Sequence, residues 1–136
     1  VYKRQLFENP PDSGVYANII ILRLGATGQG RANFYTPGRY EVVSEGSAVP
    51  AVNLNFGSGN SAKCRLRVGG SYSLGAPALR EVVPGGSHIR AVGETVVTDI
   101  NARLAPGQGL LVEIVNTGAS AADYSCSIKW WEERVS

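Results

Sequence analysis

The chain has 136 residues and a formal net charge of +2, with 43% hydrophobic and 18% charged residues. This length suits a single domain, and the composition is that of a folded protein rather than a disordered one. The small net charge gives no indication of a nucleic-acid partner, and no apolar run approaches the about 18 residues of a membrane-spanning helix. We therefore expect neither a nucleic-acid nor a membrane partner.

The first residues carry a pattern unrelated to the rest of the chain. The sequence begins without Met, and Val1 to Gln5 (VYKRQ) looks like the translated end of a sequencing adapter, a contaminant of environmental assemblies. We expect these residues to be a non-native scar on a metagenomic sequence; a processed or truncated native terminus is the alternative. The next segment, Leu6 to Gly14, contains Pro10-Pro11 and is expected to be irregular.

Alternation of apolar and polar residues predicts β-strands along the rest of the chain. Val15 to Leu24 is unusually apolar from Ile19 to Leu22, which suits a strand covered on both faces, at a sheet centre or a subunit contact. The further strands expected before residue 93 are Arg31 to Tyr35, Arg39 to Glu45, Val49 to Phe56, Ala62 to Val68, Leu79 to Val83 and His88 to Val92. The last two flank Pro84-Gly85-Gly86, a plausible hairpin, and Gly69 to Pro77 is expected to be a long loop.

Two of these strands have a clear sidedness. In Val49 to Phe56 the inward set is expected to be Val52, Leu54 and Phe56. In Ala62 to Val68 the inward set is Cys64, Leu66 and Val68, and the outward set is Lys63, Arg65 and Arg67. Each strand would therefore bury one apolar face.

The C-terminal part holds three period-two runs, Thr95 to Leu104, Leu110 to Asn116 and Tyr124 to Trp130, joined by short turn signals. They predict a half-buried antiparallel meander. With eight to ten short strands and no long helical period, the fold class is all-β. We expect one antiparallel β-sandwich of jelly-roll type over residues 1–136.

Residues with catalytic chemistry are few. His88 is the only histidine and no G-x-S-x-G motif occurs, so neither a nucleophilic triad nor a transition-metal site is expected. Asp99 and Glu113 are expected on one solvent face, where two solvated surface acids are favoured over a glycosidase pair. We expect no cofactor and no enzymatic activity; an unrecognised enzyme would need these two acids in a pocket.

The outward stripe of Lys63, Arg65 and Arg67 could bind phosphate, an anionic sugar or an acidic subunit, although a solvated sheet face is favoured. No aromatic residues are interleaved with the stripe, so we do not expect it to bind nucleic acid.

The consecutive Trp130 and Trp131 must point to opposite faces of their strand. Trp130 continues the inward set of the last run, so Trp131 is expected outward. An outward Trp is a contact with a partner subunit, a residue covered by a local loop, or a platform for stacking sugars.

The two cysteines, Cys64 and Cys126, both fall on inward faces. A disulfide joining the sheets and two buried free thiols are the alternatives. Tyr124-Ser125-Cys126 is similar to the Tyr-x-Cys of an immunoglobulin-type F strand. The similarity ends there, because no Trp follows Cys64 at the required spacing and four or more strands precede it, so no immunoglobulin domain is inferred.

The overall pattern resembles small sandwich proteins of bacteriophage virions, such as decoration proteins or fibre heads. That resemblance implies a structural virion component, found in the virion or outside the cell, which contacts other virion proteins. We expect a homo-oligomer, a trimer or a larger ring, with Trp131, Ile19 and Ile21 at the interface. The alternative is a secreted carbohydrate-binding or adhesion module that uses Trp131 to bind a glycan.

Overall fold

The computed structural model describes residues 2–83, 96–98 and 102–135. Within these ranges all regular structure is β-strand, no helix occurs, and every strand pair is antiparallel. The larger sheet, sheet A, has the order β5 (Ser47–Val49), β6 (Arg65–Val68), β1 (Tyr2–Glu8), β11 (Gly109–Asn116), β3 (Gly30–Tyr35) and β8 (Leu79–Val83). Sheet B is centred on β2 (Val15–Ala26), which pairs with β12 (Tyr124–Arg134), β10 (Ala102–Leu104) and β9 (Val96–Thr98). A separate ribbon pairs β4 (Tyr40–Ser44) with β7 (Ser71–Leu74). The expected all-β class is confirmed.

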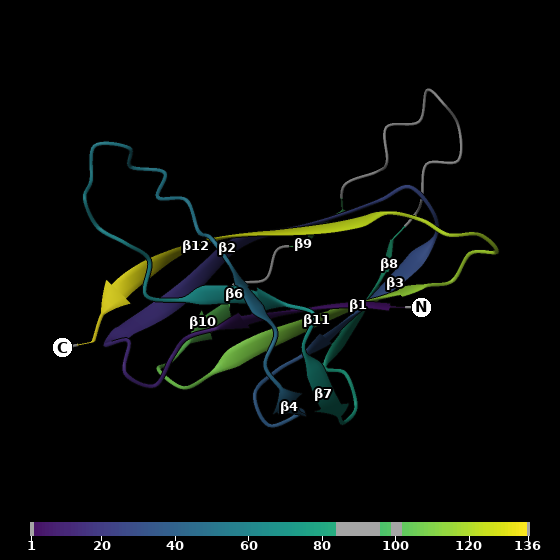
Figure 1. The fold of residues 1–136 in the computed structure, drawn as a ribbon, viewed down its shortest axis with the longest axis horizontal. Helices are drawn as coiled ribbons and strands as arrows, with labels where there is room; N and C mark the ends of the chain where they lie inside the picture. Colours follow the sequence, from purple (N-terminus) through teal and green to yellow (C-terminus); the bar gives the residue numbers. More distant parts are fainter. Residues whose placement is uncertain (1, 84–95, 99–101, 136) are drawn as a thin grey trace.

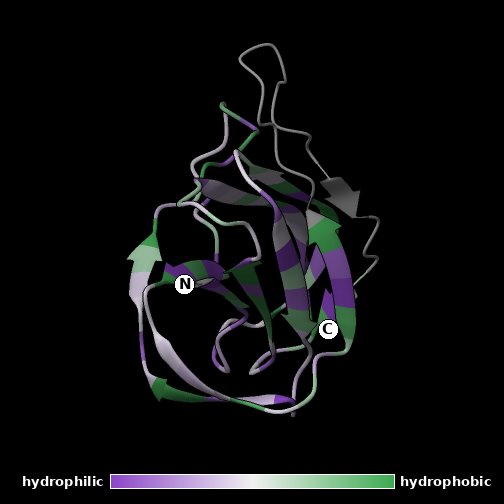
Figure 2. Ribbon diagram, turned by 90° about the vertical axis from the view of Figure 1, so that its right-hand side faces the viewer, coloured by the Kyte–Doolittle hydropathy of each residue, from purple (hydrophilic) through white to green (hydrophobic). Residues whose placement is uncertain are grey.

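Side chains of sheets A and B meet in one hydrophobic core. Figure 1 shows β2 and β12 lying over β1 and β11. Phe7 of β1 is fully buried and meets Trp130 of β12 edge to face, with ring centroids 4.8 Å apart. Leu22 and Leu24 of β2 and Phe34 of β3 lie in the same core. Alternating hydrophobic and hydrophilic residues are visible as bands of opposite hydropathy along the strands (Figure 2).

A second, smaller core lies on the opposite face of sheet A. It joins Leu6, Tyr35 and Leu111 of that sheet to Tyr72 of β7, and Tyr40 and Leu74 pack against it. The β4–β7 ribbon thus covers part of sheet A (bottom of Figure 1), and β11 is buried on both faces from Gly109 to Ile114. The expectation of a half-buried strand is wrong for β11, because the ribbon covers its second face.

The N-terminal residues form a central strand of sheet A. Residues 2–8 pair with β11 along their whole length, and residues 5–8 also pair with β6. The expected irregular segment is therefore wrong for Leu6 to Glu8, because apolar Leu6 and Phe7 face the two cores. The origin of Val1 to Gln5 as a scar stays a prediction, but residues 2–5 belong to the sheet.

The three C-terminal runs do not form a meander. β10 pairs with β2, β11 pairs with β1 and β3, and β12 returns to β2, so successive strands lie in different sheets. The run expected from Thr95 to Leu104 comprises two described strands, β9 and β10. Period-two alternation specifies which side chains face the core, but not which strand is the neighbour.

Other differences concern the middle of the chain. β7 forms inside the stretch expected to be a loop, Gly69 to Pro77, because Tyr72 fills the second core. The strand expected from Val49 to Phe56 stops at Val49, since Pro50 has no N–H to donate to a ladder. The predictions of β3, β4, β8 and the start of β12 are confirmed within a residue or two. The expected hairpin at Pro84-Gly85-Gly86 and the strand His88 to Val92 lie outside the described residues.

Asn9 joins the ends of both sheets. Its buried side chain donates hydrogen bonds to the carbonyl oxygens of Val15 (2.8 Å) and Leu104 (3.0 Å). Its backbone N–H donates to the Gln108 carbonyl at 2.9 Å, and its carbonyl accepts from Gly107, which has φ +89° in the turn after Pro106. The sequence break predicted at this Pro-Gly pair is a tight turn that only Gly accommodates without strain.

Candidate functional site

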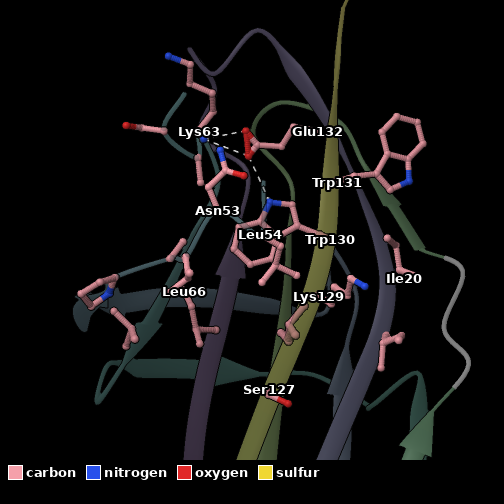
Figure 3. A pocket seen from close by; sticks show the side chains of 18 of the residues that line it. Ile20, Asn53, Leu54, Lys63, Leu66, Ser127, Lys129, Trp130, Trp131 and Glu132 are labelled. Atoms are coloured by element: carbon pink, nitrogen blue, oxygen red, sulfur yellow. Dashed lines mark hydrogen bonds between the residues drawn. The ribbon is translucent and has the colours of Figure 1, made fainter. Parts of the chain in front are cut away.

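A groove of about 1210 Å³ runs along β12 and separates it from the loop between β5 and β6. We call this loop, residues 50–62, the arm, and the hollow the edge groove. The arm projects at the upper left of Figure 1. Figure 3 shows Leu54 of the arm and Trp130 of β12 in the groove, with Leu66 of β6 beside them. These three apolar side chains form the floor of the edge groove.

The edge groove exists because β12 is the last strand of its sheet. Among the described strands β12 pairs with β2 alone, so its other edge has no strand partner. The inward side chains at that edge are only half-buried, although they pack against the core; they are Tyr124, Cys126, Ile128 and Trp130. An edge strand with such side chains is a template for a further strand.

The arm carries exposed apolar side chains, of which Val52 and Leu54 line the groove. Val52 is 75% exposed, Leu54 61% and Phe56 85%. The inward orientation expected for these residues is wrong within the isolated chain, because β6 begins only at Arg65 and leaves them no strand to pair with. The exposure of these three side chains was therefore not predicted from the sequence. The missed signal is the absence of charge from Gly46 to Ala62 in a chain with 18% charged residues.

The apolar run in β2 is explained by a β-bulge. Lys129 pairs with Ile21 and Trp130 with Ile19, which leaves Ile20 without a partner in β12. The extra residue reverses the alternation, so Ile19 is buried, Ile21 is half-buried and Ile20 is 40% exposed. Of the two expected interface residues in β2, Ile19 lies inside the core and only Ile21 lines the edge groove.

Trp131 points away from the core, on the same side as Ile20 (Figure 3). It is 51% exposed and pairs with Asn18 of β2. The buried side-chain Nδ2 of Asn18 has no hydrogen-bond partner among the described residues. On the same sheet, the Arg103 guanidinium stacks over the Tyr16 ring at 3.9 Å and lies 3.1 Å from a Glu133 carboxylate oxygen. The outward position expected of Trp131, and the inward one expected of Trp130, are what the structure shows.

The expected basic stripe is largely neutralised by acids. The Glu8 carboxylate lies 2.8 Å from Arg65 Nε and 2.6 Å from Arg67 Nε. Arg67 also donates to the Gly46 carbonyl at 2.9 Å. Lys63 is exposed, and its backbone N–H donates to the Glu132 carboxylate at 2.7 Å. Two of the three cations are therefore occupied within the chain, which leaves little positive charge for an anionic ligand.

Glu113 is not the solvated acid that its position in the alternation predicts. It is 6% exposed and forms an ion pair of 2.7 Å with Arg4 of β1. Asn33 and Tyr35 of β3 also donate to its carboxylate, at 3.2 and 3.4 Å. The expectation fails because Arg4, Asn33 and Tyr35 of the neighbouring strands surround the carboxylate. Asp99, its expected neighbour, and His88 lie outside the described residues.

Cys64 and Cys126 are free thiols in the structure. Burial, with a further contribution from Glu132, raises the pKa of Cys64 to about 12, and burial raises that of Cys126 to about 12. We expect both to react with Ellman's reagent at pH 8 roughly 1000-fold more slowly than an ordinary cysteine, because little thiolate is present. In urea both should react at the ordinary rate. Fast labelling of the native protein would contradict the burial.

The same thiols make stability depend on pH. An unfolded thiol ionises near its ordinary pKa of 9.0, whereas the folded one stays neutral up to about pH 12. The stabilisation is therefore complete below pH 9 and is lost as the pH rises toward 12.

Within the described residues, no group of three or more His, Cys, Asp and Glu side chains is arranged to hold a metal ion. The same part of the chain has no helix of the length and hydropathy that would cross a bilayer.

No model of a known protein family matches the chain, and no curated protein and no solved structure shows significant similarity to it. The argument for function therefore depends on the geometry of the edge groove and the surfaces beside it.

Proposed function

We propose that this protein is a non-enzymatic structural protein that assembles with copies of itself, built on a β-sandwich of jelly-roll type. The sandwich is supported by the single core that sheets A and B share. The assembly role is supported by one observation: exposed apolar side chains from two separate elements lie along the edge groove, on the two sides of β12 (Figure 3). They are Ile20 and Trp131 of sheet B and Val52 and Leu54 of the arm.

Clustering of this kind favours a protein interface over random exposure. Single exposed apolar residues are common on any protein, but contiguous apolar surface beside a groove marks interaction sites. Trp at such a place is typical of the residues that dominate binding energy. A homo-oligomer needs no other partner to cover this surface, which favours self-assembly.

The setting we propose for this assembly is the virion of a bacteriophage or another virus. A small all-β chain that self-associates suits a capsid decoration protein or a fibre head, which would also contact other virion proteins. In this proposal the protein is found in the virion or outside the cell and uses no cofactor.

The test is the mass of the protein in solution. Sedimentation equilibrium at micromolar concentration is expected to give a multiple of 14.4 kDa, in keeping with a symmetric oligomer. A clean 14.4 kDa monomer up to about 200 µM, a concentration at which even weak interfaces of standard size associate, would overturn the proposal.

A glycan-binding module is the second candidate, because Trp131 is half-exposed on the outer face of sheet B. An exposed aromatic face can stack on a sugar ring. Binding to a glycan panel that is lost in Trp131→Ala, by a protein that stays monomeric, would favour this function over assembly.

A further inference from the structure

We propose that the arm of one copy adds as a strand to the free edge of β12 in a second copy, and that the second copy returns the same contact. Val52, Leu54 and Phe56 would then cover the half-buried inner side chains of the partner's β12. The inference depends on the proposed self-assembly and specifies its interface.

The arm has the sequence of a strand but not the environment of one. Its apolar residues alternate with Asn53 and Asn55, so an extended arm would present one apolar and one amide face. In the single chain the three apolar side chains are exposed, and no charged residue from Gly46 to Ala62 supports a solvated loop. Such a segment is suited to burial against another sheet.

The arm is also held only locally. Asn53 Nδ2 donates to the Asn60 carbonyl at 3.0 Å, Asn55 N–H donates to Asn53 Oδ1 at 2.9 Å, and Ser58 N–H donates to the Asn55 carbonyl at 3.0 Å. In the described part of the chain, the hydrogen bonds of residues 50–60 join arm residues to one another. Extending the arm would therefore break no hydrogen bond to the body of the protein.

The acceptor is the edge of β12 from Ser125 to Trp131. Beyond this span, Lys3 donates to the Tyr124 carbonyl at one end and the Glu132 side chain binds the backbone of Lys63 at the other. Between these points β12 offers backbone groups and the half-buried Cys126, Ile128 and Trp130. An added strand would satisfy the backbone groups and complete the core, as in other strand-addition complexes.

A second copy is the favoured donor because both ends of the arm are held within its own chain. Val49 pairs with Leu66 at one end, and Glu132 binds the N–H groups of Lys63 and Cys64 at the other. In the single chain the arm leaves the groove open. Because donor and acceptor lie on the same surface, a twofold axis through that surface lets each copy give and receive an arm.

The test compares two double variants that add the same charge to the arm. Leu54→Asp/Phe56→Asp places the charges on the apolar face, and Asn53→Asp/Asn55→Asp places them on the amide face. By sedimentation equilibrium, we expect the first to raise the dissociation constant at least about 100-fold and the second less than about 5-fold. All four positions lie in an exposed loop, so far-UV circular dichroism should show both variants folded.

Hydrogen exchange locates the contact. As the wild-type concentration rises through the dissociation constant, the amides of Ser125 to Trp131 and of the arm should gain protection together, and Leu54→Asp/Phe56→Asp should abolish that gain. If Leu54→Asp/Phe56→Asp were still oligomeric, the proposed addition of the arm to β12 would be wrong, but the proposed self-assembly would stand. A wild-type monomer would overturn both, and a monomer with protected arm amides would show that the arm closes its own groove.

Discussion

Deletion of residues 1–5 is expected to lower the free energy of unfolding by about 3 to 5 kcal/mol. The deletion removes most of the β1 pairing with β11 and takes Arg4 away from the Glu113 carboxylate, which is 6% exposed. A buried carboxylate that loses its cation is strongly destabilising, and the broken ladder adds to the loss. Since domains of this kind are stable by about 5 to 15 kcal/mol, much of the stability would disappear. Urea denaturation followed by Trp fluorescence measures the change.

Lys3→Ala is the matched control for this deletion. Lys3 lies in the same strand, but its side chain is exposed and makes one long contact, 3.4 Å, with the Tyr124 carbonyl. A change within about 0.5 kcal/mol is expected for such a surface residue. If the deletion also changed stability this little, Leu6 to Glu8 alone would be sufficient for β1, in agreement with a scar at Val1 to Gln5.

Phe7→Ala is expected to destabilise the protein by about 3 to 5 kcal/mol, because removal of a fully buried aromatic ring leaves a cavity in the core. Phe7 is 0% exposed, and its ring contacts Trp130 with centroids 4.8 Å apart. The loss of this contact should also shift the emission of Trp130, so fluorescence-detected urea denaturation reports both effects.

Phe56→Ala makes the same chemical change at a position that is 85% exposed. Measured at a concentration where the wild type is monomeric, it should leave the free energy of unfolding within about 0.5 kcal/mol of the wild-type value. A large loss in Phe56→Ala would mean that the arm packs on its own chain. A small loss in Phe7→Ala would contradict the shared core of sheets A and B.

These changes separate two uses of apolar side chains in one sequence. Phe7 stands in a segment that the sequence predicted to be irregular, whereas Leu54 stands in an alternating run that predicted a strand. The first is buried because β11 and β6 flank its strand, whereas the second is exposed because Pro50 ends the pairing of β5. A residue pattern can thus predict a strand where the isolated chain has no place for one, and such a mismatch points to a partner.

The residue pattern alone determined the β class, most strand positions and the opposite orientation of Trp130 and Trp131. These features depend on the period of two along an extended backbone, which is local. The separation of the C-terminal runs into different sheets, the burial of Glu113 and the bulge at Ile20 depend on which segments become neighbours. Only the tertiary structure decided them, because pairing and the covering of a second sheet face are contacts between residues far apart in the chain.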